Sequence, residues 1–76
     1  MTFSQVLDSL EMLKEDVGIP KNLKLKINNI IQILNNKEES EETRAHKCCS
    51  ILDEISEDNS LQPFVRTQIY QIVSLL

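Results

Sequence analysis

The fold is decided by two stretches of sequence, residues 10–34, LEMLKEDVGIPKNLKLKINNIIQIL, and residues 52–76, LDEISEDNSLQPFVRTQIYQIVSLL. Each contains two runs of apolar residues at steps of three and four, the spacing that marks one face of a helix. A polar break with a proline separates the two runs. In the first stretch, Gly18 suits the end of one helix and Pro20 suits the first turn of the next. Each stretch therefore predicts a helix-turn-helix hairpin.

The apolar pattern extends beyond these stretches and predicts four helices, near residues 3–17, 20–35, 41–58 and 62–76. Ser40 is well placed to cap the third helix, because serine accepts a hydrogen bond from a free N–H of the first turn. The expected core residues are Phe3, Val6, Leu7, Leu10, Leu13 and Val17; Leu23, Ile27, Ile30, Ile31 and Leu34; Ala45, Cys48, Cys49, Leu52 and Ile55; and Val65, Ile69, Ile72, Val73 and Leu76.

The two hairpins match when the chain is shifted by 42 residues. Apolar positions coincide, the Glu-Asp pair at residues 15–16 falls on that at residues 57–58, and Lys24 falls on Arg66. The prolines are one position out of register. Any two amphipathic hairpins of equal length would align their apolar positions, but this does not account for the shared Glu-Asp or the Lys/Arg match. The match therefore favours a duplicated hairpin.

A period of 42 lies within the range of HEAT and armadillo repeats, which stack in solenoids. A solenoid generally needs at least three repeats, so two hairpins must bury their apolar faces against each other. The expected fold is all-α, an antiparallel four-helix bundle formed by one domain, residues 1–76. Its hairpins are residues 1–36 and 40–76.

Composition excludes several classes of protein. A net charge of −4 disfavours non-specific binding to nucleic acid or anionic membranes. Uncharged stretches are too short to span a bilayer, and the N-terminus lacks the features of a signal peptide. The adjacent Cys48 and Cys49 are poorly placed for a mutual disulfide on a helix, which favours a reducing compartment. We therefore expect a cytoplasmic protein without membrane partners.

No catalytic motif is visible in the sequence. Gly18 is the only glycine, which excludes a glycine-rich phosphate loop, and the single histidine, His46, has no clear nucleophile to pair with. We expect no enzymatic activity and no cofactor.

The second hairpin resembles a known group of proteins. Residues 50–59, SILDEISEDN, followed by residues 63–67, PFVRT, and residues 69–75, IYQIVSL, are similar to an archaeal family catalogued as uncharacterised protein family 0147. The resemblance covers nearly the whole chain and is strongest over residues 45–75. It implies a small antiparallel four-helix protein. The family has no established activity, so it supplies no site residues.

Two departures from the family pattern stand out. Glu41 occupies the position where the family tends to have a proline, although Arg44 is kept. The sequence also stops at Leu76, where relatives continue a little further.

The apolar surplus on the fourth helix suggests a binding surface. Phe64 and Leu75 extend its apolar face to one side and Tyr70 extends it to the other, while Ile33 is the repeat partner of Leu75. Lone exposed apolar residues are normal. A joined patch of Phe64, Leu75, Leu76 and Ile33 would instead mark a protein partner or a homodimer. The leading hypothesis is a non-catalytic protein–protein interaction module, self-association included.

The alternative hypothesis is an RNA- or ribosome-associated accessory protein. It uses a basic patch of Lys21, Lys24, Lys26, Arg44 and Arg66. Against it, acidic residues are numerous nearby, and lysine and arginine stems also cover helix junctions without binding anything.

One helix flank carries residues that can bind metal. Glu42, His46, Cys49 and Asp53 follow steps of four, three and four along the third helix, and all four are ligand types for zinc or other transition metals. One straight helix rarely closes a tetrahedral shell, so a solvated flank is the simpler interpretation. Cys48 and Cys49 fall on core positions of the first hairpin and are expected to pack as small apolar residues.

Overall fold

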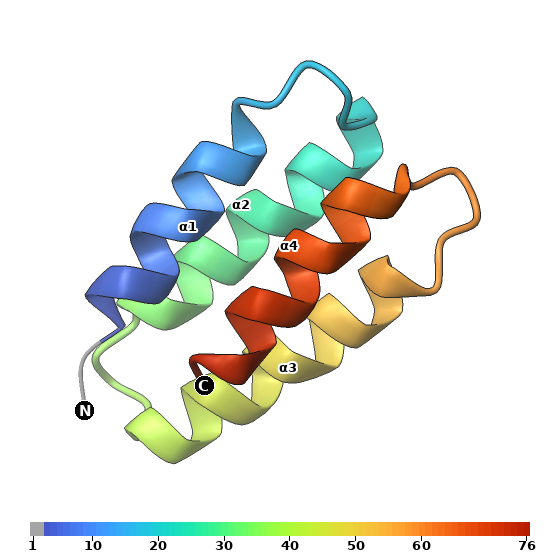
Figure 1. Ribbon diagram of the computed structural model, residues 1–76. Coiled ribbons are helices and arrows are strands. Elements are labelled where there is room, and N and C mark those ends of the chain that lie inside the picture. The colour runs from blue at the N-terminus through green and yellow to red at the C-terminus, as the bar shows by residue number, and fades with distance from the viewer. Residues whose placement is uncertain (1–2) are drawn as a thin grey trace.

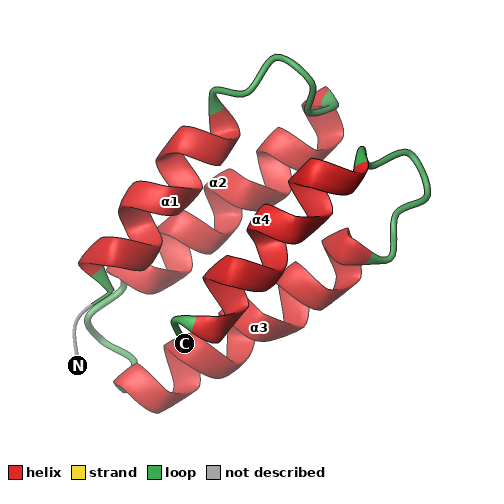
Figure 2. Cartoon of the chain, viewed as in Figure 1, coloured by secondary structure: helices red, strands yellow, loops and turns green. Residues whose placement is uncertain are grey.

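The computed structural model describes residues 3–76 and contains four helices (Figure 1). They are α1 (Ser4–Lys14), α2 (Lys21–Asn35), α3 (Glu41–Ser56) and α4 (Pro63–Ser74). No strand occurs among the described residues (Figure 2), so the predicted all-helical class is confirmed. Residues 1 and 2, with which the predicted first hairpin begins, lie outside the described residues.

The four helices form a closed ring. The chain turns back after each helix (Figure 1). Helix α1 lies beside α2, α2 beside α3, α3 beside α4, and α4 closes the ring on α1, whereas the backbones of the diagonal pair α2 and α4 are not adjacent. The α2/α3 contact is the most extensive and the α1/α4 contact the least. Within residues 3–76, none of the helices combines the length and apolarity that a membrane crossing requires.

The core lies along the axis of the ring and is entirely apolar. Among the described residues, no polar or charged side chain is buried. The buried side chains, which come from all four helices and both hairpin turns, are Phe3, Val6, Leu10, Leu13, Ile19, Leu23, Ile27, Ile30, Leu34, Cys48, Leu52, Ile55, Leu61, Val65, Ile69 and Ile72. Six partly buried apolar residues pack against them, namely Leu7, Ile31, Ala45, Ile51, Val73 and Leu76.

The assignment of Val17 to the core was wrong. Its side chain is 98% exposed. Helix α1 ends at Lys14 rather than at residue 17, so Val17 lies in the turn and the helical spacing no longer applies to it. Ile19 is the buried apolar residue of this turn, as Leu61 is in the other hairpin.

The two hairpin turns are built by the same hydrogen bonds. The Gly18 N–H donates to the Asp16 side chain at 2.8 Å, and the Ser60 N–H donates to the Asp58 side chain at 2.8 Å. Such an aspartate turn satisfies a backbone donor beyond the helix end. The Ser60 N–H and hydroxyl both donate to Asp58 and hold the pKa of its carboxyl below the usual value. The Glu-Asp pairs shared by the hairpins therefore have a local structural role.

These turns explain why α1 and α3 are shorter than predicted. Helix α1 ends three residues before the predicted position 17, and α3 ends at Ser56 rather than at residue 58. Gly18 was expected to end a helix, but Glu15 is the C-cap of α1 and no glycine has a positive φ. The position 42 residues later is occupied by Ser60, which shows that this turn does not depend on glycine.

Helices α2 and α4 begin at equivalent positions, with Pro20 and Gln62 as their N-caps. Proline stands at the N-cap of α2 but at the first residue of α4, Pro63. Neither position needs an N–H for helical hydrogen bonding, so a proline fits either one. This accounts for the one-residue offset between the prolines. Ser40 caps α3 as expected, because its hydroxyl accepts a hydrogen bond from the Thr43 N–H at 3.2 Å.

The buried core gives a first prediction. Leu52→Ala removes a fully buried side chain and should lower the free energy of unfolding by about 2–5 kcal/mol, because the cavity cannot collapse completely. Val17→Ala should change it by less than about 0.5 kcal/mol. Urea denaturation followed by circular dichroism measures both. Equal effects of the two substitutions would contradict the assigned core.

Candidate functional site

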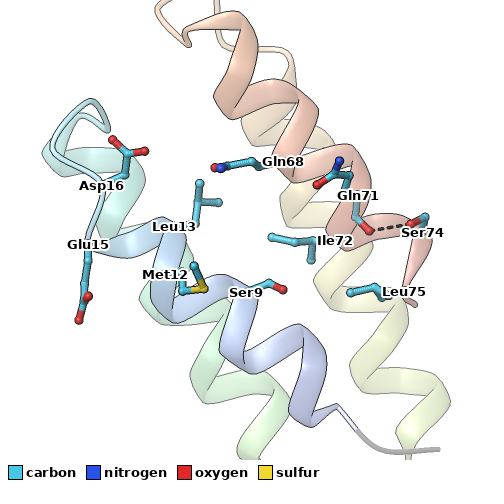
Figure 3. A pocket seen from close by; sticks show the side chains of 10 residues that line it. All are labelled: Ser9, Met12, Leu13, Glu15, Asp16, Gln68, Gln71, Ile72, Ser74 and Leu75. Carbon is cyan, nitrogen blue, oxygen red and sulfur yellow. Dashed lines mark hydrogen bonds between the residues drawn. The ribbon is translucent and has the colours of Figure 1, made fainter.

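A groove lies between α1 and α4. It has a volume of about 610 Å³. Leu13 and Ile72 project from opposite helices into the space between them (Figure 3). The lining residues are Ser9, Met12, Leu13, Glu15 and Asp16 from α1 and its turn, and Gln68, Gln71, Ile72, Ser74 and Leu75 from α4 and its C-cap.

The α2/α3 side of the ring carries a cross-helix ion pair at the positions that correspond to this groove. There Lys26 Nζ donates to Glu54 Oε1 at 3.0 Å and bridges the two helices. At an interval of 42 residues, Lys26 corresponds to Gln68 on α4, and Glu54 corresponds to Met12 on α1. Both Gln68 and Met12 line the groove. Helices α1 and α4 thus lack the ion pair that links α2 to α3. An ion pair spans the α2/α3 surface, whereas no such pair spans the groove between α1 and α4 at the corresponding positions.

The residues predicted to form an interaction patch lie in different places. Phe64, Tyr70 and Leu75 are 47%, 55% and 37% exposed on α4. Leu76 is half-buried and packs against the core. Ile33 is half-buried on α2, whose backbone is not adjacent to that of α4, so the structure does not join it to Phe64 and Leu75.

Met12 is the groove residue that sequence reasoning missed. Its side chain is 75% exposed although it is large and apolar. The helical pattern already places Met12 away from the core face of α1. Only the contact between α1 and α4, however, brings it opposite Gln68, and no local sequence signal reports that contact.

The two arginines of the predicted basic patch bind the carbonyl ends of helices. Arg44 Nη1 donates to the Leu34 carbonyl at 2.8 Å, and its guanidinium lies 5.2 Å from the centre of the Phe3 ring. Arg66 Nε donates to the Ser56 carbonyl at 3.1 Å, and its Nη2 donates to the Asp58 carbonyl at 3.3 Å. The Leu34 and Ser56 carbonyls belong to the last turns of α2 and α3, where carbonyls lack helical partners and carry the negative end of the helix dipole. The Asp58 carbonyl, in contrast, lies in the turn after α3 and also accepts from the Leu61 N–H.

The lysines of that patch all lie on α2. Lys26 forms the ion pair with Glu54. Lys21 is exposed and Lys24 is half-buried, and neither has an ion-pair partner within residues 3–76. The structure therefore leaves two lysines of the five basic residues unpaired, which is little charge for binding a phosphate backbone.

The metal-ligand candidates on α3 do not form a cluster. Glu42, His46 and Asp53 are exposed, and Cys49 is half-buried. In the described part of the chain, no group of three or more histidine, cysteine, aspartate or glutamate side chains is arranged to hold a metal ion. The flank provides ligand types without the second helix that would complete a coordination shell.

Both cysteines are free thiols with weakened acidity. Cys48 is fully buried at the position equivalent to Val6, and burial raises the pKa of its thiol from 9.0 to about 12. Burial, together with the charge of Asp53, raises the pKa of Cys49. The thiolate is the reactive form, so neither cysteine is activated for catalysis or redox chemistry.

The roles of the arginines give a second prediction. Arg66→Met removes two hydrogen bonds to carbonyls and should lower the free energy of unfolding by about 1–2 kcal/mol. Lys21→Met, which removes an unpaired charge, should change it by less than about 0.5 kcal/mol. Chemical denaturation measures stability, and a gel shift with total RNA measures binding. If Arg66→Met weakened RNA binding without changing stability, the structural role would be contradicted.

The buried thiol gives a third prediction. Because the pKa of Cys48 is raised in the folded state, its contribution to stability is complete below pH 9 and is lost as pH rises towards about 12. Cys48→Val, which copies Val6, should remove this decline. The wild-type protein should lose about 1 kcal/mol more than the variant between pH 8 and pH 10. Urea titrations at each pH measure the difference, and parallel curves would refute it.

Comparison with known proteins identifies the relatives of this chain. The sequence model of the Uncharacterised protein family (UPF0147) matches residues 1–76. A UPF0147 protein of Methanothermobacter thermautotrophicus is 37% identical over 75 residues, which cover 99% of this chain and 74% of that protein. A UPF0147 protein of Methanosarcina mazei is 39% identical over 72 residues, which cover 95% of this chain and 77% of that protein.

A solved structure shares the fold as well. The crystal structure of a protein from uncharacterised family UPF0147 of Thermoplasma acidophilum matches with a TM-score of 0.90 and 30% sequence identity. The match covers 95% of this chain and 85% of the other. The sequence similarity to archaeal relatives and the structural similarity agree, and the chain belongs to the UPF0147 family.

Proposed function

We propose that the protein is a non-catalytic protein–protein interaction module that binds its partner at the α1/α4 groove and the adjoining outer face of α4. The observation that carries this proposal is the contrast between two equivalent surfaces. The α2/α3 side is bridged by Lys26 and Glu54, whereas Gln68 and the exposed Met12 line an open groove at the corresponding positions.

The chemistry of the groove fits a protein partner. Its floor and walls include Leu13, Ile72, Met12 and Leu75, and its other lining side chains are hydroxyls, amides and two carboxylates. Apolar residues surrounded by neutral hydrogen-bonding groups are typical of protein interfaces, in which methionine and aromatic residues are enriched and lysine is depleted. A small molecule is less well suited, because ordinary ligand pockets enclose most of the ligand surface.

The non-catalytic role is part of the proposal. The pKa of the Asp58 carboxyl is lowered by hydrogen bonds from the serine of its own turn, Ser60, which is a structural role. The cysteines are poorly acidic thiols. Active sites usually contain groups whose pKa is tuned to transfer a proton or attack a substrate. The free thiols also suit a reducing compartment, and we place the protein in the cytoplasm.

We further infer that the architecture is an antiparallel four-helix bundle made from two copies of one hairpin. Three features support this duplication: α1 and α3 end 42 residues apart and α2 and α4 begin 42 residues apart, the aspartate turns match, and Cys48 is buried 42 residues after the buried Val6. RNA association has less support, because Arg44 and Arg66 bind helix carbonyls and Lys26 pairs with Glu54.

A fourth prediction tests the groove. Met12→Glu combined with Gln68→Lys copies the Glu54–Lys26 pair onto α1 and α4 and leaves the net charge unchanged. The fold should persist, because equivalent positions already hold this pair, while the groove should close. In pull-downs from native lysate and from purified protein, the wild-type chain should retain a partner or a second copy that the double variant loses.

The matched control is Asn22→Glu with Asn29→Lys, which adds one charge of each sign to exposed residues of α2, away from the groove. It should retain whatever the wild-type protein retains. If the groove variant bound the same proteins as wild type, or if wild type retained nothing, the proposal would be overturned.

A further inference from the structure

The outer face of α4 carries no charge. Its exposed residues, with the C-cap, are Pro63, Phe64, Thr67, Gln68, Tyr70, Gln71, Ser74 and Leu75. The only charged residue of α4, Arg66, is half-buried and donates to carbonyls at the end of α3. In a chain with 20 charged side chains among 76 residues, such a face is unusual. Residues of α2 at the equivalent positions include Lys21 and Lys26, so the fold itself does not require an uncharged helix surface.

One stripe along this face is symmetric in its spacing and its chemistry. Phe64, Gln68, Gln71 and Leu75 follow steps of four, three and four, which place them on one side of the helix. The stripe reads apolar, amide, amide, apolar in both directions. A two-fold axis midway between Gln68 and Gln71 would set Phe64 against the partner's Leu75 and Gln68 against the partner's Gln71. An interface between identical chains requires this kind of self-complementarity.

We propose that the occupant of this surface is a second copy of the same chain, packed so that the two α4 helices run antiparallel across a two-fold axis. This inference rests on the proposed function and names the partner. Apolar groups then meet apolar groups at both ends of the stripe, and side-chain amides meet side-chain amides at its centre, where each can donate and accept a hydrogen bond.

The uncharged face is the surface on which two copies of this acidic chain meet with least repulsion. Two chains of net charge −4 repel each other, and repulsion is smallest where neither presents a charged side chain. The acidic end of the groove, at Asp16, lies beside the Gln68 end of α4, while Leu75 marks the other end (Figure 3). The two-fold axis places the Asp16 end of one copy towards the partner's Leu75. The acidic ends of the two copies are thereby kept apart.

The available area is sufficient for a dimer. A standard interface buries about 800 Å² from each partner. The described residues expose 4889 Å² in a molecule with extents of 33 × 19 × 18 Å, so one of its four long sides supplies an area of this order. The contact would cover Phe64, Leu75 and the groove residue Met12, which are exposed in the single chain.

The fifth prediction concerns the mass in solution. Sedimentation velocity at protein concentrations up to about 1 mM should show wild-type protein at twice the chain mass of 8.8 kDa. Raising salt from about 50 mM to about 500 mM should strengthen the dimer, because it screens the repulsion between two acidic chains. Wild-type protein that stays monomeric throughout would overturn the inference.

Paired charge substitutions locate the interface. Gln68→Glu with Gln71→Glu, and separately Gln68→Lys with Gln71→Lys, should each weaken the homodimer at least about tenfold, because like charges then face each other across the axis. An equimolar mixture of the two variants should recover the dimer, since opposite charges would then be paired. Circular dichroism checks that each variant is folded. A mixture that stays monomeric would contradict the proposed pairing.

The control adds the same charge to the opposite side of the molecule. Asn22→Glu with Asn29→Glu changes exposed residues of α2, 42 positions before Phe64 and Gln71, and should leave the dimer at wild-type strength. If this control weakened the dimer as much as the Gln68/Gln71 variants, the assigned face would be wrong. Failure here is distinct from failure of the proposed function, because a monomer that still retains another protein through the groove would overturn only the homodimer.

Discussion

Neither hairpin can cover its own apolar side, and the packing of one hairpin against the other is the contact on which the whole structure depends. Each helix contacts two neighbours in the ring, so its apolar residues are covered only when all four helices are present. A domain of this size has little surface to bury, and it buries only apolar side chains within the described residues. The polar and charged side chains of residues 3–76 therefore all lie at least partly exposed on the outer faces.

The two hairpins share their turns and differ on their outer faces. Asp16 and Asp58 accept the same hydrogen bond in the two turns, and α2 and α4 start 42 residues apart. Yet α2 exposes Lys21, Leu25 and several asparagines, while α4 exposes Phe64, Tyr70 and glutamines. Either set of exposed residues is compatible with a stable helix. The residues that the two hairpins share build the turns. The residues that differ give α4 an outer face unlike that of α2.

Much of the fold could be predicted from sequence because helical periodicity is a local signal. The number of helices, most core residues and the Ser40 cap follow from spacing within a few residues. The helix ends were less predictable, since the turn bonds of Asp16 and Asp58 compete with continued helix and leave Val17 in solvent. Family membership, inferred from the second hairpin, is confirmed by the match to the whole chain.

The site was much less predictable, because it depends on which helices become neighbours. Phe64 and Leu75 could be recognised as surplus apolar residues. Met12 could be assigned to the groove only once the structure showed that it and Gln68 line the same hollow. Ile33 and Leu75, which match at an interval of 42 residues, lie on α2 and at the C-cap of α4, two helices whose backbones are not adjacent. The roles of Arg44 and Arg66 were likewise hidden, since a basic residue that caps a neighbouring helix has the same sequence signature as one on a free surface.

The ring of contacts also bears on the order of folding. Helices α1 and α2, and α3 and α4, are joined by short turns, so each pair can meet after closing only a small loop. The α1/α4 contact joins the two ends of the sequence and requires the largest loop closure. Folds dominated by contacts between neighbouring segments form quickly, and their most distant contacts incur the greatest entropy loss. The α1/α4 groove would accordingly be assembled last, which means that the surface available to a partner appears only on chains whose folding is already complete.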